Sequence, residues 1–413
     1  MASEKVMMGL DIGSSWIRAV VGSVSKDGQL MIDSICERPS EGVRNGVIVN
    51  AEQTLKSIAS VIQEAELQAG ADVQGVITGI GGSTIESRQS EGVAGITTRG
   101  LEITNSDIFR SLDVARTFEL SNDRVILHTL VQDFSVDGQN GIKDPTFMSG
   151  HRLESRALIV TGNDLNCQNT KKCLQRAGIS STRLVLKQLA DAEVVLSTDE
   201  KEMGTILINI GSNCSDMIVY KNGYPVYVGG VDLGGSSVTN DIAYILQKPK
   251  TVAEQIKCEY GSCYIPSVDS DEMITIPQIG GLPSIRLPKR ELSKIIEPRM
   301  AEIFSLLKQK LEEKNIRGTF GGGVVLVGGS SLLSGATELA TEIFKMQARI
   351  GFPEALAGLD RSYINPKYTT VLGLLKSEAK KKVKTASDGK KHKTAPEEPG
   401  IFRKISNFLK TVI

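Results

Sequence analysis

Two widely separated stretches of the chain follow the same plan, and this repetition constrains the fold more than any other feature. The first is VMMGLDIGSSWIRAVVG and the second is TILINIGSNCSDMIVY. Each has an apolar strand, a polar residue near its end (Asp11, then Asn209), an Ile-Gly-Ser turn and a second apolar strand. We therefore expect one type of α/β domain to occur twice.

The turns that follow the two strands have the composition of a phosphate-binding site. Backbone N–H groups in such turns can face an anion, and a carboxylate at a strand end can hold a hydrated cation. One Asp-Ile-Gly turn usually only reverses the chain, but two at matched positions could close on a phosphate chain. The residues expected to bind phosphate are Gly13, Ser14, Ser15, Gly211 and Ser212, and Asp11 is expected to hold Mg²⁺ through water.

Three further segments suit a nucleotide cleft. In VVLVGGSSLLSG a buried strand runs into two glycines that would let a flat ring approach the backbone, and DLGGSS is another flexible turn before a helix. AEQIKCEYG predicts a helix with an acid and a base on one face. Taken singly, these are a strand-to-helix turn and a surface ion pair. The residues concerned are Gly234, Gly235, Glu254, Lys257, Gly328 and Gly329.

Composition narrows the class of protein. The chain has 413 residues, 40% of them hydrophobic and 23% charged, enough for two or more ordinary globular domains. Basic and acidic residues number 48 each, so no overall field favours nucleic acid. The cysteines form no CxxC pair, which argues against a zinc site or a disulfide framework. Without an apolar run long enough to span a membrane, or a signal-peptide pattern, we expect a cytoplasmic protein.

The sequence GIFRKISNFLKTVI, residues 400–413, predicts an amphipathic helix. Its apolar face consists of Ile401, Phe402, Ile405, Phe408, Leu409, Val412 and Ile413. A helix of this length is roughly 21 Å long, too short for a hydrocarbon core of about 30 Å. The lysine-rich segment 379–399 before it is expected to be a disordered linker. We therefore expect a membrane-surface helix; docking on the protein's own core or in a partner's groove are the alternatives.

The order of these elements resembles that in the superfamily of actin, the sugar kinases and the heat-shock-chaperone ATPases. Within it, the chain is similar to the FtsA family of bacterial actin-like cell-division proteins. The similar segments are DGQNGIKDPTFMSGHRLE, DLGGSSVTNDIAYIL, AEQIKCEYG, LSKIIEPR and the amphipathic tail. They span nearly the whole chain, and GIKDPTFMSGHRLE is far more specific than any glycine turn.

The resemblance implies an α/β fold of two actin-like lobes, each a ribonuclease-H-like domain, with ATP between them. The implied first lobe is 1–83 and 163–195 with a return near 365–378, and a subdomain at 84–162 is inserted in it. The implied second lobe has a core at 196–230 and 307–364 and a nucleotide- and partner-binding subdomain at 231–306.

The resemblance also implies partners and a location. Members polymerise on the inner face of the cytoplasmic membrane at the division site, where they tie the tubulin-like polymer FtsZ to the membrane. The inserted subdomain would contact other copies and later division proteins, and the tail would be the membrane hook. The FtsZ C-terminal peptide would bind subdomain 231–306. There the cations Lys289, Arg290, Lys294 and Arg299 suit an acidic peptide, and Arg299 is the favoured contact.

Departures from the superfamily pattern bear on catalysis. Asn209 and Asn213 replace an aspartate and a glycine of the second phosphate turn, and Lys187 stands where catalytic relatives carry a water-orienting Glu or Gln. We therefore expect ATP binding with weak or no hydrolysis, and assign no catalytic residue. The alternatives are a metabolite kinase of the same fold and another bacterial actin-like filament for cell shape or plasmid segregation. Asn209 and the tail argue against the kinase.

Overall fold

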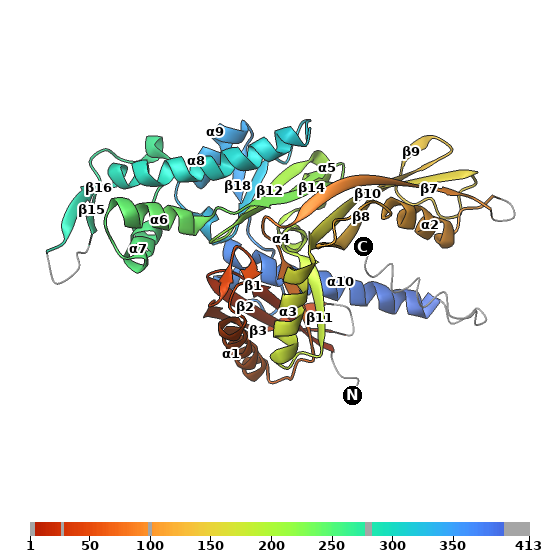
Figure 1. Cartoon of the computed structure of the whole chain (residues 1–413), viewed down its shortest axis with the longest axis horizontal. Coiled ribbons are helices and arrows are strands. Elements are labelled where there is room, and N and C mark those ends of the chain that lie inside the picture. Colours follow the sequence, from red (N-terminus) through yellow and green to blue (C-terminus); the bar gives the residue numbers. More distant parts are fainter. Residues whose placement is uncertain (1–4, 26–28, 98–100, 277–282, 392–413) are drawn as a thin grey trace.

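The structure is a computed structural model that describes residues 5–25, 29–97, 101–276 and 283–391. Two five-stranded sheets form the centres of two lobes, the second lobe above the first in Figure 1. The first sheet has the order β11-β6-β1-β2-β3 and the second the order β14-β13-β12-β17-β18. Their strands are β1 (Lys5–Ile12), β2 (Trp16–Val24), β3 (Leu30–Pro39), β6 (Gly75–Ile80), β11 (Ser181–Leu186), β12 (Thr205–Ile210), β13 (Ser215–Lys221), β14 (Tyr224–Val231), β17 (Val324–Val327) and β18 (Ala348–Ile350).

The two sheets share one topology. β1 is antiparallel to β2 and parallel to β6, and β12 is likewise antiparallel to β13 and parallel to β17. Because the central strands are buried on both faces, β1 and β12 are almost continuously apolar. This repetition confirms the duplicated α/β fold expected from the two Ile-Gly-Ser turns.

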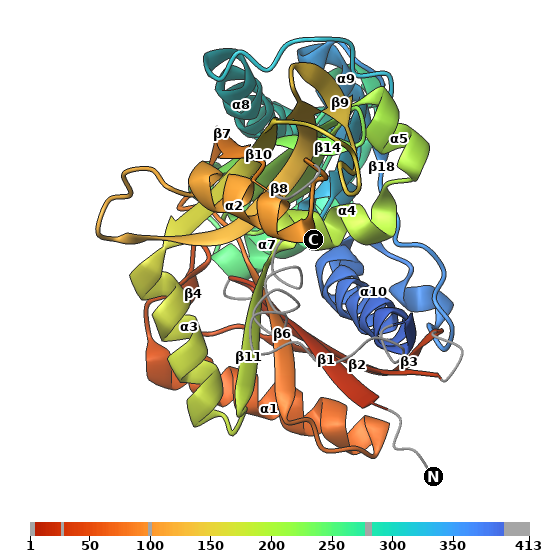
Figure 2. The ribbon, with the colours of Figure 1, turned by 90° about the vertical axis from the view of Figure 1, so that its right-hand side faces the viewer.

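Helices cover both faces of the first sheet. Met8 and Leu10 of β1 belong to one apolar cluster with residues of α1 (Ala51–Ala69) and α3 (Asp164–Arg176), while Met7 belongs to another with residues of α10 (Thr369–Lys391). Figure 2 shows α1 and α10 on opposite sides of this sheet. In the second sheet, alternate residues of β12 likewise face opposite cores. One of these cores contains α6 (Gly235–Ile245) and α8 (Lys289–Glu313), and the other contains α4 (Lys187–Val195).

A four-stranded sheet of order β7-β10-β8-β9 forms a separate subdomain between β6 and α3 in the chain. It extends beside the second lobe in Figure 1 and contacts that lobe: Gln132 Nε2 donates to the Pro225 carbonyl at 2.9 Å. Its elements are β7 (Glu86–Gly95), α2 (Asn105–Ala115), β8 (Arg124–Val136), β9 (Gln139–Ile142) and β10 (Arg152–Asn163). The specific block GIKDPTFMSGHRLE falls on β9, β10 and the loop between them.

The remaining elements are short connections, apart from α7, which lies beside the cleft. They are β4 (Val43–Arg44), β5 (Val47–Ile48), α5 (Thr198–Met203), α7 (Lys250–Tyr260), β15 (Met273–Ile276), β16 (Ile285–Pro288), α9 (Ala336–Phe344) and the 3₁₀ helices η1 (Ile265–Ser267), η2 (Gly329–Leu332), η3 (Arg361–Tyr363) and η4 (Pro366–Tyr368).

The C-terminal region differs from the sequence prediction. The expected disordered linker at 379–399 is wrong for residues 379–391, because α10 continues to Lys391. The first half of α10 is anchored in the core through Val371, Leu372 and Leu375, and the following alanines and lysines are good helix formers that can extend an existing helix. The predicted amphipathic helix at 400–413 lies outside the described residues. Within the part that the structure describes, no helix is long and apolar enough to cross a bilayer.

The contact between α10 and α4 gives a stability prediction. A side chain at Gly373 would clash with the backbone carbonyl of Ala190 on α4. Alanine favours a helix by about 1 kcal/mol over glycine, but overpacking a tight contact commonly costs about 1–3 kcal/mol or more. We therefore expect Gly373→Ala to lower the thermal unfolding midpoint. Gly95→Ala, where an added methyl meets no atom within 4 Å, is the control. An unchanged midpoint for Gly373→Ala would contradict the close contact.

Candidate functional site

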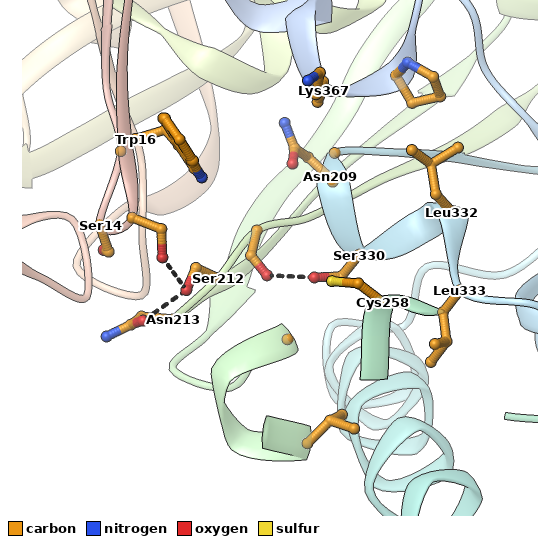
Figure 3. Close-up of a pocket in the computed structure, with 18 of the residues that line it drawn as sticks. Ser14, Trp16, Asn209, Ser212, Asn213, Cys258, Ser330, Leu332, Leu333 and Lys367 are labelled. Atoms are coloured by element: carbon orange, nitrogen blue, oxygen red, sulfur yellow. Dashed lines mark hydrogen bonds between the residues drawn. The ribbon is translucent and has the colours of Figure 1, made fainter. Parts of the chain in front are cut away.

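A cavity of about 600 Å³ lies between the two lobes (Figure 3). Its walls are the turns at the ends of β1, β12 and β17, together with residues of α6 and α7. Of the residues predicted from the sequence to bind nucleotide, those that line it are Asp11, Gly13, Ser14, Ser15, Gly211, Ser212, Gly235, Glu254, Lys257, Gly328 and Gly329. Gly234 is not in the wall but caps α6 directly behind it.

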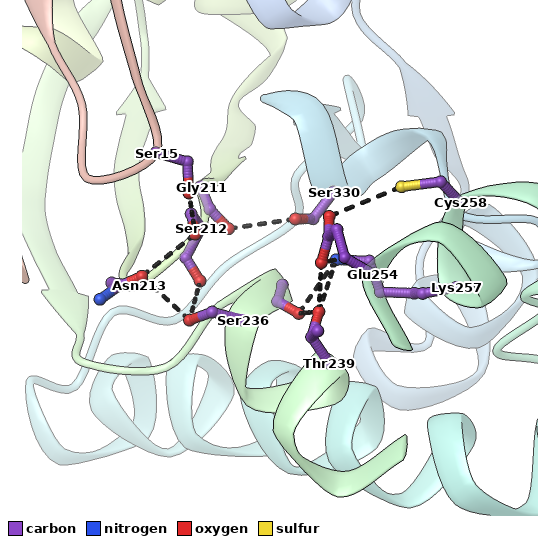
Figure 4. A network of polar contacts seen from close by, with 11 residues as sticks. Ser15, Gly211, Ser212, Asn213, Ser236, Thr239, Glu254, Lys257, Cys258 and Ser330 are labelled. Atoms are coloured by element: carbon purple, nitrogen blue, oxygen red, sulfur yellow. Dashed lines mark hydrogen bonds and ion pairs between the residues drawn. The ribbon is translucent and has the colours of Figure 1, made fainter. Parts of the chain in front are cut away.

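The two predicted phosphate turns face each other across the cleft. Each is closed by the same type of hydrogen bond, from Gly13 N to the Trp16 carbonyl and from Gly211 N to the Cys214 carbonyl, both at 3.0 Å. Ser15 Oγ of the first lobe donates to Ser212 Oγ of the second at 2.6 Å (Figure 4). Hydroxyl groups from both lobes therefore meet at one point, where they could donate to an anion.

The start of α6 lies against the second turn. Ser236 N donates to the Ser212 carbonyl at 2.8 Å, and Ser236 Oγ donates to Asn213 Oδ1 at 2.9 Å. A side chain at Gly234 would lie 2.6 Å from the carbonyl oxygens of Gly211 and Ser212, so glycine permits this approach. The positive end of the α6 dipole consequently adds to the anion-binding character of the turn.

Glu254 and Lys257 lie at the other end of the cavity and are not an ordinary surface pair. Lys257 is only 8% exposed, and its Nζ donates to Glu254 Oε2 at 2.8 Å, Thr239 Oγ1 at 3.0 Å and the Gly235 carbonyl at 3.1 Å. Burial alone would raise the pKa of Glu254, but Lys257 and the hydrogen bonds outweigh it and lower the pKa. The pair is thus a fixed polar wall (Figure 4).

The Gly-Gly turn after β17 forms the opposite wall. Gly328 has φ +86°, and an added side chain there would lie 2.6 Å from the Ile210 carbonyl, so only glycine fits. The helix expected after this turn is the short 3₁₀ helix η2, and Leu332 and Leu333 complete the wall (Figure 3). Backbone and apolar side chains here suit the flat ring of a nucleobase.

Asp11, predicted to hold Mg²⁺ through water, is paired with a lysine. Lys187 Nζ lies 2.7 Å from Asp11 Oδ1 and donates to the Ile12 carbonyl at 3.0 Å. Burial would lower the pKa of Lys187, but the Asp11 carboxylate outweighs it and raises the pKa, so the side chain is an ammonium. Among the described residues, no group of three or more His, Cys, Asp or Glu side chains could hold a metal ion.

Asn209 is fixed from behind by a buried carboxylate that the sequence analysis missed. Asn209 Nδ2 donates to Asp191 Oδ2 at 2.7 Å and to Thr370 Oγ1 at 3.2 Å. Asp191 Oδ1 accepts from Thr369 at 2.7 Å and from Thr370 at 2.8 Å. Burial raises the pKa of Asp191 to about 6, although these hydrogen bonds oppose it. With its nitrogen engaged, Asn209 has only its oxygen to offer the cavity that it lines.

Two other cavity residues were also missed. Asp216 is the register partner of Asn209 on β13, and its buried carboxylate accepts from Gly82 N at 3.0 Å. Burial raises the pKa of Asp216 to about 6, against the charge of Lys187. An acidic residue within the mostly apolar strand β13 is a sequence signal that could have identified Asp216 as a candidate site residue. Trp16, the only tryptophan, follows the first turn and is 42% exposed in the cavity wall.

The four predicted partner-binding cations lie in the first part of α8 but differ in their contacts. Arg299 forms a two-pronged ion pair with Asp241 of α6, at 2.7 and 3.1 Å, and also contacts Glu302. Lys289 pairs with Glu272 at 2.9 Å and lines the cavity, and Lys294 pairs with Glu291 at 2.6 Å. Arg290 is exposed. Arg299 therefore holds α6 and α8 together, whatever else it binds.

Similar structures share the two-lobed fold. A type IV pilus biogenesis complex, PilM–PilN, aligns with a TM-score of 0.64 at 18% identity, covering 89% of this chain and 97% of that chain. MreB5 of Spiroplasma citri bound to AMPPNP aligns with a TM-score of 0.56 at 14% identity, covering 94% and 99%. Together with the duplicated sheets, these alignments establish an actin-like ATPase fold.

Sequence comparisons identify the family. A family model described as cell division protein FtsA matches residues 206–373, and one described as an SHS2 domain inserted in FtsA matches 82–161, close to the predicted insertion at 84–162. Cell division protein FtsA of Pseudomonas aeruginosa is 39% identical, with 90% of this chain and 89% of that protein aligned. FtsA of Borreliella burgdorferi is 38% identical, with 99% and 98% aligned. The chain therefore belongs to the FtsA family of bacterial actin-like cell-division proteins.

Proposed function

We propose that this cell-division protein binds ATP between its lobes, polymerises on the inner face of the cytoplasmic membrane and anchors FtsZ there. The observation that carries ATP binding is the meeting of the two phosphate turns, joined by the Ser15–Ser212 hydrogen bond at 2.6 Å. The cavity of about 600 Å³ has the size of a small-ligand site. Its phosphate end and its nucleobase end are chemically distinct, which supports a nucleoside triphosphate.

The same cavity supports slow hydrolysis or none. Phosphoryl transfer to water needs a group that orients the attacking water, and loss of one such group commonly costs about a hundredfold or more. Lys187, an ammonium, cannot accept the proton of that water, and Asn209 is a neutral amide. Bound ATP would then act mainly as a clamp that favours the closed arrangement of the lobes.

A Mg²⁺ ion held by Asp11 does not fit the side chains around it. Asp11 Oδ1 is buried and accepts no hydrogen bond from the residues that the structure describes, and the Lys187 ammonium lies 2.7 Å from it, so a metal ion there would be held close to a fixed positive charge. The clamp proposed here consequently uses only groups of the protein and the phosphates, and no step passes through a metal ion.

The membrane and FtsZ contacts rest on the sequence and on family membership. α10 leads from the core to Lys391, and the amphipathic segment 400–413 follows. We propose that this segment lies on the inner membrane surface at the division site, and that the inserted subdomain contacts other copies and later division proteins. The basic start of α8 is the proposed site for the FtsZ C-terminal peptide. A metabolite kinase receives no support from the cavity, because a catalytic carboxylate base at Asn209 is absent.

Hydrolysis can be tested by single-turnover assays with lipid present, so that filaments can form. We expect a rate at least about a hundredfold below that of sugar kinases of this fold. Asn209→Asp alone would set a second carboxylate against Asp191, whose Oδ2 lies 2.7 Å from the Asn209 amide. Asn209→Asp with Asp191→Asn keeps one carboxylate and one amide in this pair, so it should raise the rate more than the single change. A wild-type rate near that of sugar kinases would refute the clamp.

Membrane attachment can be tested by co-sedimentation with anionic lipid vesicles. Phe402→Glu with Phe408→Glu should abolish binding, because each half-buried apolar side chain contributes about 1 kcal/mol and the new carboxylates are repelled by the lipid. Ser406→Glu with Asn407→Glu adds the same charge to the polar face and should retain more binding. ATP affinity should be unchanged in both. Equal binding by the two variants would contradict insertion of the apolar face.

Peptide capture can be tested by titrating the FtsZ C-terminal peptide. Arg299→Glu should weaken binding about tenfold, the usual value of a hydrogen-bonded charge. Because Arg299 also bonds Asp241, the control is Asp241→Asn, which weakens the same contact with α6 but keeps the Arg299 charge. A similar loss of peptide affinity in both variants, or no loss of affinity in Arg299→Glu, would show that Arg299 is not part of the peptide site.

A further inference from the structure

The ammonium of Lys187 lies in the cavity wall, beside the first of the two predicted phosphate turns. Lys187, the first residue of α4, reaches Asp11 Oδ1 at 2.7 Å and the Ile12 carbonyl at 3.0 Å. The side chains are almost fully enclosed, with 14% of Lys187 and 11% of Asp11 exposed. The Ile12 carbonyl accepts a hydrogen bond from this ammonium, whereas Asp11 Oδ1 is an ion-pair partner that accepts none from the described part of the chain. N–H donors therefore remain for a further acceptor.

The surrounding backbone leaves room for this lysine in particular. A side chain at Gly79 of β6 would lie 2.8 Å from Lys187 Cγ, and one at Gly81 would lie 3.2 Å from Lys187 Cδ. The lysine stem therefore runs past two positions that have no side chain. The same point at Gly81 lies 2.7 Å from Asp216 Oδ2, so Lys187 also passes beside the carboxylate of the second lobe. The stem of Lys187 thus runs near Asp216 of the second lobe, whose charged form it stabilises, while its ammonium pairs with Asp11 of the first lobe.

The buried ammonium of Lys187 changes whether a metal ion is needed to neutralise Asp11 when phosphates bind. An unpaired Asp11 would repel the phosphates of a nucleotide and would require a cation between them. With Lys187 in contact, the charge of Asp11 is already balanced by the protein. A divalent ion approaching Asp11 would meet the positive charge of Lys187, whose Nζ lies 2.7 Å from Asp11 Oδ1.

We propose that Lys187 is the resident cation of this cavity: it neutralises Asp11 and supplies to bound phosphates the positive charge that a metal at Asp11 would otherwise supply. The inference rests on the proposed ATP binding and makes Lys187 a determinant of metal dependence. ATP should bind almost equally well with Mg²⁺ and without it. Removal of the ammonium should make binding depend on Mg²⁺, because Asp11 is then free to hold the ion through water.

The experiment measures ATP affinity of the full chain through the fluorescence of Trp16, in Mg²⁺ and in excess EDTA. For the wild type we expect less than about a threefold difference between the two buffers. Lys187→Met keeps the stem but loses the charge, so affinity in EDTA should fall about tenfold and Mg²⁺ should restore most of it. Adding Asp11→Asn to Lys187→Met should abolish that restoration.

Lys367→Met is the matched control. This other lysine of the cavity lining pairs with Glu37 at 3.6 Å and not with Asp11, so its loss should leave binding independent of Mg²⁺. A merely structural role for Lys187 would lower affinity equally in both buffers and would overturn the proposal. So would a tenfold Mg²⁺ dependence in the wild type, a result that needs no variant to fold. Failure of the wild type to bind ATP in either buffer would instead overturn the proposed nucleotide function.

Discussion

The ion pair between the buried carboxylate of Asp11 and the ammonium of Lys187 is the interaction on which the rest of the site depends. Asp11 lies at the end of the central strand of the first lobe, where burial without a counter-charge would be costly. Lys187 supplies that counter-charge, and because it begins α4 it also fixes the start of this helix against the first sheet. Breaking such a pair by removing one partner leaves an uncompensated buried charge, which is strongly destabilising. The ion pair therefore positions the first predicted phosphate turn as well as neutralising Asp11.

Asp191 extends this arrangement to the C-terminal helix. Its carboxylate joins three elements: α4, on which it lies, the end of β12 through Asn209, and the start of α10 through Thr369 and Thr370. A buried network of this kind has few alternative arrangements, because each unmade hydrogen bond leaves a polar group without a partner. A change at the phosphate end of β12 is thus physically connected to α10, the helix that leads toward the amphipathic segment.

The architecture could be predicted well from the sequence because short local patterns mark the main strands and turns. Apolar strands that end in Ile-Gly-Ser mark the two central strands, and their identical pairing in the structure confirms the duplication. Five of the twelve predicted nucleotide-binding residues lie in the turns directly after these two strands, so their convergence followed from the fold. The prediction that nucleotide binding is better preserved than hydrolysis stays a prediction.

What could not be predicted depends on contacts between distant segments. Asp191 is indistinguishable in sequence from any helix carboxylate, and its hydrogen bonds arise only where α4 packs against both the end of β12 and the start of α10. The pairing of Arg299 with Asp241 requires the side-by-side placement of α6 and α8. The extent of α10 was missed for another reason: a lysine-rich composition indicates exposure, yet the same residues propagate a helix once a packed segment has started it.

The ATP clamp proposed for this site would suit a protein that, as also proposed, works in many copies on a membrane. One short amphipathic helix offers only reversible attachment, because the cost of ordering it offsets much of what its apolar face contributes. Linked copies raise the effective concentration of each helix at the surface and bind far more firmly together. The lifetime of the linked state then matters more than the rate of any single binding event. On this proposal, the ammonium beside Asp11 and the neutral amide of Asn209 would both favour a long-lived closed form, since the ammonium attracts phosphates and neither group can accept a proton from the attacking water.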